Sequence, residues 1–283
     1  MMEKGKGASL NSEEVREFHA PSCGIFFIKK EVLHREKSPY QEILVIDNEH
    51  FGKVLFLDGL VQTTEKDEFF YHEMLIHPAL ISHPSPLEIL IIGGGDGGCL
   101  KEILRYQIEK AYLVEIDPSM INVSKKYLPW LGSCLEDERI ELINMDGKEF
   151  VRQTEQKFDV VIIDISEPVG PSLALHQKNF YLELKNCLKD NAVVAAQIGS
   201  PYFDLGSIVQ KNKFFREIFT NVYFYLGPTP TYPGGSWCYT YLSDKINPFE
   251  IRRDFPSGLK YFNPEIHRAA FALPNFMKEA LGQ

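Results

Sequence analysis

Residues 87–104 read LEILIIGGGDGGCLKEIL, and this stretch decides the fold. An apolar run ends in a glycine-rich turn, and apolar residues at helical spacing follow the turn. This order predicts a buried β-strand, a tight turn and the beginning of a helix. Glycine permits positive φ and lets a ligand approach the backbone closely. The N-terminus of the helix offers free N–H groups to electron-rich ligand atoms.

The glycines of this turn fit a nucleotide-binding pattern, which is weak by itself. Gly93, Gly95 and Gly98 match G-x-G-x-x-G. A second apolar run, AYLVEID, ends at Glu115, about where an acidic residue binds ribose hydroxyls in such folds. Because the motif stands between a predicted strand and a predicted helix, we interpret it as nucleoside-binding. The alternative is a glycine-rich turn with a structural role only.

Strands and helices alternate along the chain after this turn. Apolar strands between helices predict a doubly wound, mostly parallel sheet that is covered on both faces. The predicted strands are 88–92, 111–115, 140–144, 158–163, 192–197 and 221–226, and 237–243 is expected as an antiparallel addition. Helices are expected near 98–105, 118–127, 147–154, 178–188 and 204–219, with a short last helix in NFMKEALG.

The N-terminal part of the sequence has a different pattern. We expect residues up to about Glu17 to be frayed. The runs GIFFIKKEVL, YQEILVID and KVLFLDGLVQTT are separated by turn-forming residues, which predicts a small antiparallel β-domain. A helical pattern follows in EKDEFFYHEMLIHPAL. We therefore predict a β-domain over residues 1–66 and an α/β domain over 67–283.

Composition narrows the classes of partner and the compartment. The 283 residues carry a net charge of −9, which disfavours nucleic acid and anionic membranes and suits a cationic substrate. Five cysteines without C-x-x-C spacing favour free, buried thiols in a reducing cytoplasm over disulfides or zinc. The first residues contain no apolar signal segment, and no apolar run has membrane-spanning length.

Carboxylates follow four successive strands, so they should meet at one edge of the sheet. A single acidic residue at a strand end is usually a cap or turn residue, but four together suggest a site. Glu115 suits ribose and Asp146 suits an adenine amino group. Asp96 and Asp164 are then left over, with Glu167 nearby, and surplus carboxylates attract a cation.

Aromatic residues strengthen the hypothesis of a cation site. Tyr71 lies on the helix before the central strand, and Tyr232 lies in the Pro/Gly-rich loop PTPTYPGGSW. Tyrosine faces hold ammonium groups, and the hydroxyl can accept hydrogen bonds from them. A single tyrosine is more often ordinary packing than a ligand contact, but the positions of these two in a loop and on a helix favour a role in the site. His72 could contact a ligand or be a satisfied core histidine.

Several blocks of the chain resemble, in order, those of the polyamine aminopropyltransferase family, and its spermidine synthases most closely. The resemblance extends from about Ser22 to Leu281. Its blocks are FGKVLFLDGLVQTTEKDEFFYHEML, IIGGGDGG, VEID, DGKEF, DISEPVGPS, PTYPGG and YFNPEIHRAAFALPNF. It implies an N-terminal β-domain and a Rossmann-like, methyltransferase-like catalytic domain, as the residue pattern also predicts.

The resemblance implies a reaction and its partners. Members transfer an aminopropyl group from decarboxylated S-adenosylmethionine, a co-substrate, to a diamine that is usually putrescine. They release methylthioadenosine, need no metal or other cofactor, and usually form homodimers or homotetramers. Other acceptors, namely 1,3-diaminopropane, cadaverine or agmatine, remain alternatives.

The resemblance also implies a set of site residues. The catalytic residues are Asp164 and Tyr71. Asp164 would accept the proton of the attacking amine, and Tyr71 would orient that amine. Donor-binding positions are Gln41, Gly95, Asp96, Glu115, Asp146, Gly147 and Pro171. Polyamine-binding positions are Tyr71, His72, Asp96, Asp164, Glu167 and Tyr232. Asp96 would also repel ordinary S-adenosylmethionine, which carries a carboxylate that the decarboxylated donor lacks.

One position departs from the family pattern, and three rival functions remain. The family commonly has aspartate where this chain has Glu167, and this difference bears on the identity of the acceptor and not on the reaction class. An S-adenosylmethionine-dependent methyltransferase often has an acidic residue just before G-x-G, where Ile91 and Ile92 stand here. A nicotinamide-dependent dehydrogenase would leave DISEPVGP unexplained. A non-catalytic relative is disfavoured because Asp96 and Asp164 are present.

Overall fold

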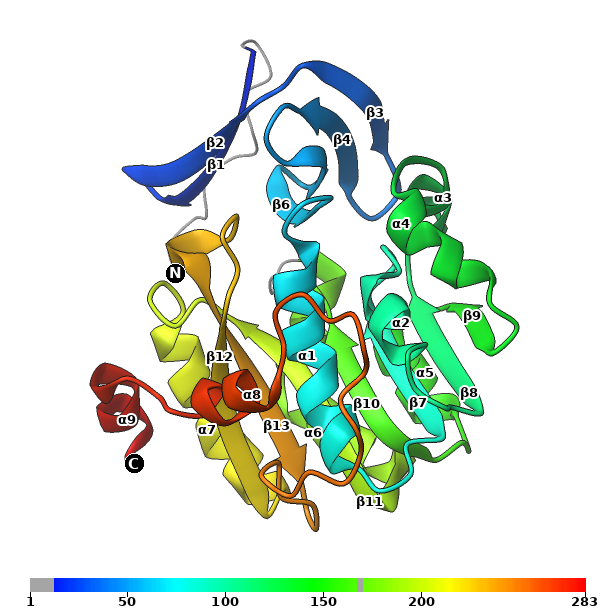
Figure 1. Cartoon of the computed structure of the whole chain (residues 1–283), viewed down its shortest axis with the longest axis vertical. Coiled ribbons are helices and arrows are strands. Elements are labelled where there is room, and N and C mark those ends of the chain that lie inside the picture. Colours follow the sequence, from blue (N-terminus) through cyan, green and yellow to red (C-terminus); the bar gives the residue numbers. More distant parts are fainter. Residues whose placement is uncertain (1–12, 167–169) are drawn as a thin grey trace.

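A seven-stranded sheet forms the centre of the molecule (Figure 1). The computed structural model describes residues 13–166 and 170–283. Along the sheet the strand order is β12-β13-β11-β10-β7-β8-β9. The strands are β7 (Glu88–Gly93), β8 (Lys110–Glu115), β9 (Ile140–Asn144), β10 (Phe158–Asp164), β11 (Leu188–Gly199), β12 (Asn221–Pro228) and β13 (Ser236–Ser243). The predicted α/β class with a mostly parallel sheet is confirmed.

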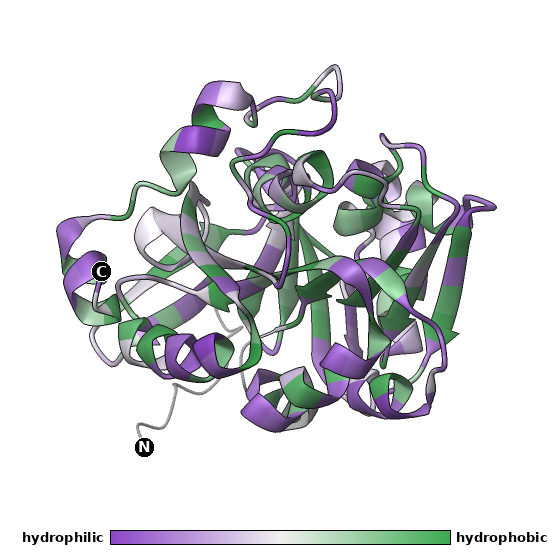
Figure 2. Ribbon diagram, turned by 90° about the horizontal axis from the view of Figure 1, so that it is seen from below, coloured by the Kyte–Doolittle hydropathy of each residue, from purple (hydrophilic) through white to green (hydrophobic). Residues whose placement is uncertain are grey.

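The central strands are apolar because helices cover both faces of the sheet. Ile89, Ile91 and Ile162 belong to one buried cluster, whereas Leu90 and Val161 belong to the cluster on the other face. Side chains alternate between the two faces of a strand, so strands buried on both sides show continuous apolar runs. Figure 2 shows this arrangement, with hydrophobic residues concentrated in the strands and hydrophilic residues on the outer sides of the helices.

One helix connects the two parts of the chain and covers one face of the sheet. Helix α1 (Glu68–Ser82) packs on α2 (Gly98–Ile103) and on β10–β13. The opposite face is covered by α5 (Gly147–Gln153), α6 (Lys178–Leu184), α7 (Leu205–Ile218) and α9 (Asn275–Leu281). Further helices are α3 (Pro118–Tyr127), α4 (Pro129–Gly132) and α8 (Pro264–Ala270). In α1, Glu73 accepts backbone hydrogen bonds from residues 260–262, which fixes the C-terminal segment against the helix.

The antiparallel strand lies inside the sheet. β13 pairs antiparallel with both β11 and β12. It therefore separates β12 from β11, although these two strands run in the same direction. Buried aromatic residues pack at this place, since Tyr239 stacks on its cross-strand partner Tyr225 of β12 and also lies beside Tyr71 of α1. The insertion carries the preceding loop, with Tyr232, back over α1.

The N-terminal part consists of two sheets. β1 (Glu14–Ala20) and β2 (Cys23–Ile28) form a hairpin, and a second sheet has the order β3-β4-β5-β6. Its strands are β3 (Glu31–Lys37), β4 (Glu42–Asn48), β5 (Gly52–Leu57) and β6 (Leu60–Thr64). The expectation of frayed chain up to Glu17 is wrong for residues 14–17, because Val15 is buried against this part's core. The run GIFFIKKEVL is also not one strand, since β2 ends before β3 begins.

The five cysteines are free, as expected, but they are not all buried. Cys99, Cys187 and Cys238 are buried, whereas Cys134 is half-buried and Cys23, the first residue of β2, is exposed. Within residues 13–166 and 170–283, no helix combines the length and apolar character that crossing a membrane requires.

Candidate active site

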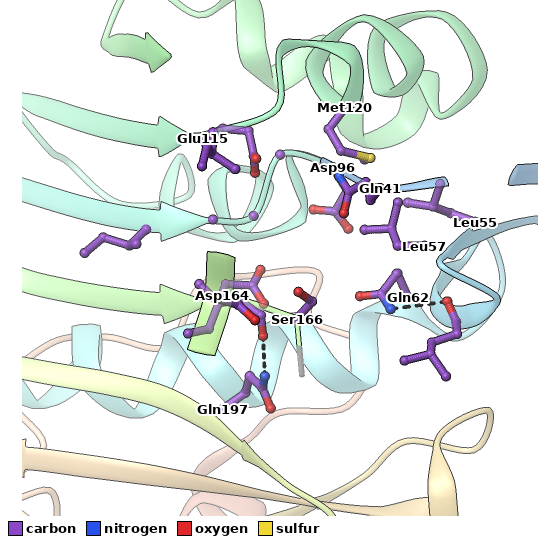
Figure 3. A pocket seen from close by; sticks show the side chains of 18 of the residues that line it. Gln41, Leu55, Leu57, Gln62, Asp96, Glu115, Met120, Asp164, Ser166 and Gln197 are labelled. Carbon is purple, nitrogen blue, oxygen red and sulfur yellow. Dashed lines mark hydrogen bonds between the residues drawn. The ribbon is translucent and has the colours of Figure 1, made fainter. Parts of the chain in front are cut away.

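A cavity of about 190 Å³ opens at the carboxyl ends of β7, β8 and β10. In Figure 3, Glu115, Asp96 and Asp164 point into this space from the strand ends and the glycine turn. Leu55 and Leu57 approach from β5 on the opposite side. The cavity therefore lies between the central sheet and the N-terminal sheet.

The register of the central strands brings the catalytic candidates to one edge. Asp164, the last residue of β10, pairs with Gly93, the last residue of β7. A side chain at Gly93 would stand 2.1 Å from the Asp164 carbonyl oxygen, so glycine is required for this approach. The N–H of Gly94 donates to the same carbonyl at 2.9 Å. The glycine turn thus holds the backbone of Asp164 in place.

Glu115 and the glycine turn form one side of the cavity. Glu115 ends β8, and its Oε1 accepts from the backbone N–H of Asp117 at 2.9 Å. A Cβ on Gly95 would be 2.8 Å from Glu115 Oε2, which explains glycine at this position. Burial raises the pKa of Glu115 to about 7, although the Asp117 N–H and other backbone donors oppose the shift. A carboxylate with such a pKa becomes neutral just below neutral pH.

The other predicted donor-binding residues also line the cavity. Asp146 begins α5 and accepts from the N–H of Lys148 at 2.7 Å. The side-chain amide of Gln41 donates to Asp117 Oδ2 at 2.9 Å, which fixes the amide at the cavity wall. Gly147 packs so closely that a Cβ would lie 2.4 Å from a methyl carbon of Ile92. The structure brings together these three residues with Gly95, Asp96 and Glu115.

Asp164 is held by two donors. The Tyr71 hydroxyl donates to Oδ1 at 2.5 Å, and the Cys99 thiol donates to Oδ2 at 3.1 Å. Burial raises the pKa of Asp164 and the nearby negative charge of Asp96 adds to the rise, while the hydrogen bonds counteract it. A carboxylate with a raised pKa is a better proton acceptor than an ordinary aspartate.

Aromatic rings surround this carboxylate. The ring of Tyr232 lies 5.6 Å from that of Tyr71 and 4.8 Å from that of Trp237, between ring centroids. Its hydroxyl donates to the carbonyl of Gln62. Tyr71 and Tyr232 therefore face the same cavity, as the sequence interpretation expected.

His72 lies beside Asp96 at the end of the cavity next to α2. Ligand atoms of His72, Asp96 and Asp164 all lie within 4.8 Å of one another, a spacing that a metal ion could use. The pKa of His72 is nevertheless raised well above its usual value, because the charges of Asp96 and Glu68 outweigh its burial. Asp96 and Asp164 beside this ring also suit an ammonium group, which is the ligand that the sequence analysis expects. The absence of a metal cofactor remains a prediction.

Two predicted residues fall outside this description. Glu167 lies outside the described residues. Pro171 belongs to the 3₁₀ helix Gly170–His176, but its side chain is outside the described part of the chain. Their predicted roles in acceptor and donor binding therefore remain expectations.

The cavity also has lining residues that the sequence analysis did not identify. Glu17 and Gln62 come from the N-terminal strands, and Gln197 and Trp237 from β11 and β13. Gln197 accepts from the Trp237 indole N–H at 2.9 Å. For two of these residues the sequence offered a signal of a role in the site. Gln197 stands at the end of an apolar strand, and Glu17 is a glutamate in a region that was expected to be frayed.

Comparison with known proteins shows the family to which the chain belongs. Residues 68–253 match the Spermine/spermidine synthase domain, and residues 15–65 match the Spermidine synthase tetramerisation domain. The chain belongs to the spermine/spermidine synthase family. It is accordingly an enzyme, a polyamine aminopropyltransferase.

Relatives of this family are similar over most of the chain. Polyamine aminopropyltransferase from Thermoanaerobacter sp. (strain X514) is 44% identical over 254 residues, covering 88% of this chain and 91% of the relative. That from Moorella thermoacetica is 43% identical over 268 residues, covering 94% and 95%.

Two spermidine synthase crystal structures have nearly the same fold. One, in complex with the transition state analogue AdoDATO, has a TM-score of 0.92 with this aminopropyltransferase. The other, from Thermotoga maritima, has a TM-score of 0.91. Each is 37% identical and covers 99% of this chain and 98% of its own.

Proposed function

We propose that this aminopropyltransferase uses decarboxylated S-adenosylmethionine as donor and a diamine, with putrescine first, as acceptor. The observation that carries the proposal is the pair Asp96 and Asp164, two carboxylates beside a predicted nucleoside site in one cavity. The nucleoside would lie against Glu115, with its ribose hydroxyls donating to the carboxylate, and Asp146 would accept from the adenine amino group. This placement directs the sulfonium arm toward Asp96.

The chemistry needs a base more than an acid. The amine nitrogen attacks the propyl carbon next to sulfur, the carbon–sulfur bond breaks, and its electron pair leaves with a neutral thioether. An aliphatic ammonium has no lone pair, and its ordinary pKa is near that of lysine, about 10.4. In the proposal Asp164 accepts the ammonium proton, and Tyr71 orients the carboxylate that holds the amine. Holding the amine in line with the carbon–sulfur bond supplies further acceleration.

The acceptor is proposed from its charges. A diamine presents two ammonium groups, one for Asp164 and one for the distal part of the cavity near Tyr232, where Glu167 is also expected. Putrescine is the proposed acceptor, and 1,3-diaminopropane, cadaverine and agmatine are the alternatives. Measuring kcat/KM for these four amines distinguishes them, and a preference for any of the others over putrescine would overturn this choice.

A turnover assay with two donors tests the reaction. The enzyme should form spermidine and methylthioadenosine from decarboxylated S-adenosylmethionine and putrescine, as measured by chromatography with mass detection. A methyltransferase would instead use ordinary S-adenosylmethionine and release S-adenosylhomocysteine. Efficient methyl transfer would overturn the proposal, as would the absence of any aminopropylated amine.

Nucleoside binding should depend on pH through Glu115. Because its pKa is raised to about 7, the side chain is ionised above this pH and neutral below it. The ionised form accepts ribose hydrogen bonds better, so methylthioadenosine affinity should fall by about tenfold between pH 8 and pH 5.5. Calorimetric titration measures this. In Glu115→Gln the affinity should be low at both pH values, and a retained pH dependence there would contradict the assignment.

Assembly is proposed to involve the N-terminal hairpin. The match to a tetramerisation domain supports an oligomer, and exposed apolar side chains lie on β1 and β2, namely Phe18, Phe26 and Ile28. Such residues are typical of an interface between copies of a chain. Light scattering should give the mass of a homodimer or homotetramer, and a monomer at all concentrations would contradict the proposal.

A further inference from the structure

The buried imidazole of His72 lies between two carboxylates. Its Nδ1 is 2.8 Å from Glu68 Oε2, one turn earlier on α1, and its Nε2 is 3.5 Å from Asp96 Oδ2 in the glycine turn. His72 is only 2% exposed and Glu68 only 4%, so the contact between them is shielded from water, whereas the Asp96 contact faces the cavity. Nδ1 is at hydrogen-bond distance from Glu68, and the 3.5 Å between Nε2 and Asp96 is an ion-pair contact. Ionised carboxylates only accept hydrogen bonds, so the imidazolium form, with an N–H on each nitrogen, fits both contacts.

A lysine completes the arrangement on the far side from the cavity. Lys101 of α2 contacts Glu68 Oε1 at 2.5 Å and Glu102 at 3.4 Å. Helix α2 can approach this closely because Gly98 has no side chain, since a Cβ there would stand 2.1 Å from the His72 ring. Lys101 thus contacts Glu68, Glu68 contacts His72, and His72 contacts Asp96, so positive and negative side chains alternate in this order.

We propose that Glu68 is a positioning residue that holds His72 with its Nε2–H directed at Asp96, and so fixes the Asp96 carboxylate for the aminopropyl ammonium of the donor. Glu68 does not line the cavity. It acts through His72, which does. This inference rests on the proposed function, because the group that Asp96 would hold is the donor's ammonium.

The charges around His72 determine what happens when Glu68 is neutralised. Among the described residues, His72 is faced by Glu68 and Tyr71 from α1, Asp96 from the glycine turn and Asp164 from β10. Lys101 of α2 is one contact further away, on Glu68. Without the Glu68 charge, the positive charge of Lys101 on this side disfavours protonation of His72. A neutral His72 whose proton stays on Nδ1 would present a lone pair to Asp96 and push its carboxylate away.

The pKa directions agree with this geometry. The charges of Asp96 and Glu68 raise the pKa of His72 despite its burial, and the His72 and Lys101 contacts lower the pKa of Glu68 despite its burial. A raised pKa means that the His72 ring keeps its proton to higher pH than an ordinary histidine does.

Glu68→Gln in the full-length enzyme tests the inference with two measurements. Imidazole NMR of histidine-labelled protein, assigned with a His72→Gln sample, follows the His72 proton from pH 6 to 9 without requiring turnover. We expect wild-type His72 to stay protonated and the Glu68→Gln ring to become neutral within this range. The donor KM of the variant should be near wild type at pH 6 and rise by about tenfold by pH 9, with a smaller change in kcat.

Three further variants make the test specific. Glu68→Asp keeps the charge and should retain most of the wild-type titration, which provides rescue by a conservative change. Lys101→Met removes the opposing charge and should leave His72 protonated throughout. Glu217→Gln removes an exposed glutamate that pairs with Lys178 on another helix, and it should leave both measurements unchanged.

Two outcomes would overturn the inference. One is a folded Glu68→Gln enzyme in which His72 stays protonated to pH 9. The other is a donor KM that rises equally at every pH, which would indicate a structural role only. If Glu68→Gln does not fold, Lys101→Met decides, since a neutral His72 there would refute the assigned charge order. Absence of aminopropyl transfer in wild type would refute the proposed function while the NMR titration still tests the role of Glu68.

Discussion

In Asp164→Asn, kcat should fall by about 10²–10⁴-fold, because an amide cannot accept the proton of the attacking ammonium. The amide keeps nearly the same shape, and its oxygen can still accept from the Tyr71 hydroxyl, which bonds Oδ1 in the parent enzyme. The strand position is held by backbone contacts to the glycine turn and not by the carboxylate. Fold and nucleoside binding should therefore survive while the chemical step is lost.

Single-turnover kinetics with saturating donor and putrescine measures this loss, and calorimetry with methylthioadenosine checks that binding remains within about threefold. Asp190→Asn is the matched control, because this aspartate lies on the adjacent strand β11 and pairs only with exposed Lys245 at 3.2 Å among the contacts found. It should have wild-type kcat. A near-normal rate in Asp164→Asn would show that another group accepts the proton.

Much of this site follows from local sequence patterns. A buried parallel strand has to end at the edge where ligands bind, so Glu115 and Asp164 could be placed there from apolar runs alone. The glycines were informative for the same reason, since a Cβ at Gly93 would meet the backbone of Asp164 and one at Gly95 would displace the side chain of Glu115. Each of these inferences depends on one strand and the turn that follows it.

Contacts between distant segments could not be predicted in this way. The insertion of β13 between β11 and β12 brings together segments far apart in the sequence, such as the stacked cross-strand pair Tyr225 and Tyr239, and no local periodicity encodes this order. Glu17 reaches the cavity only because β1 pairs with β2 and Glu17 accepts from the N–H of Val61 at 2.8 Å. The pairing of Glu68 with His72 fits i,i+4 spacing, but its meaning appears only once Asp96 stands on the other side of the ring.

Asp96→Asn should weaken the discrimination between the two forms of the donor. Asp96 Oδ1 accepts from the N–H of Gly98 at 2.9 Å, and an asparagine oxygen can keep this bond and the turn. What disappears is the negative charge beside the donor's arm. The decarboxylated donor carries only an ammonium there, whereas ordinary S-adenosylmethionine adds a carboxylate, which a nearby like charge repels.

The charge left behind strengthens the expected effect. Asp96 is the largest of the charges that raise the pKa of His72, so this part of the effect is expected near pH 6, where the contact with Glu68 keeps the ring protonated. The cavity side of the imidazolium then has no carboxylate partner. This cation attracts the carboxylate of S-adenosylmethionine and repels the ammonium of the decarboxylated donor. Both changes act in the same direction, so the selectivity should fall by more than either the loss of attraction or the loss of repulsion alone would produce.

The measurement is the ratio of the inhibition constant of S-adenosylmethionine to the KM of the decarboxylated donor. We expect this ratio to fall by about 10- to 100-fold in Asp96→Asn, which corresponds to about 1.4–2.7 kcal/mol of differential binding. Asp58→Asn is the control, because Asp58 also lines the cavity and asparagine tolerates its positive φ of 50°. That variant loses the same charge without a neighbouring imidazolium, so it should change both constants alike. An unchanged ratio in Asp96→Asn, or an equal fall in both variants, would show that the donor's arm does not lie beside Asp96.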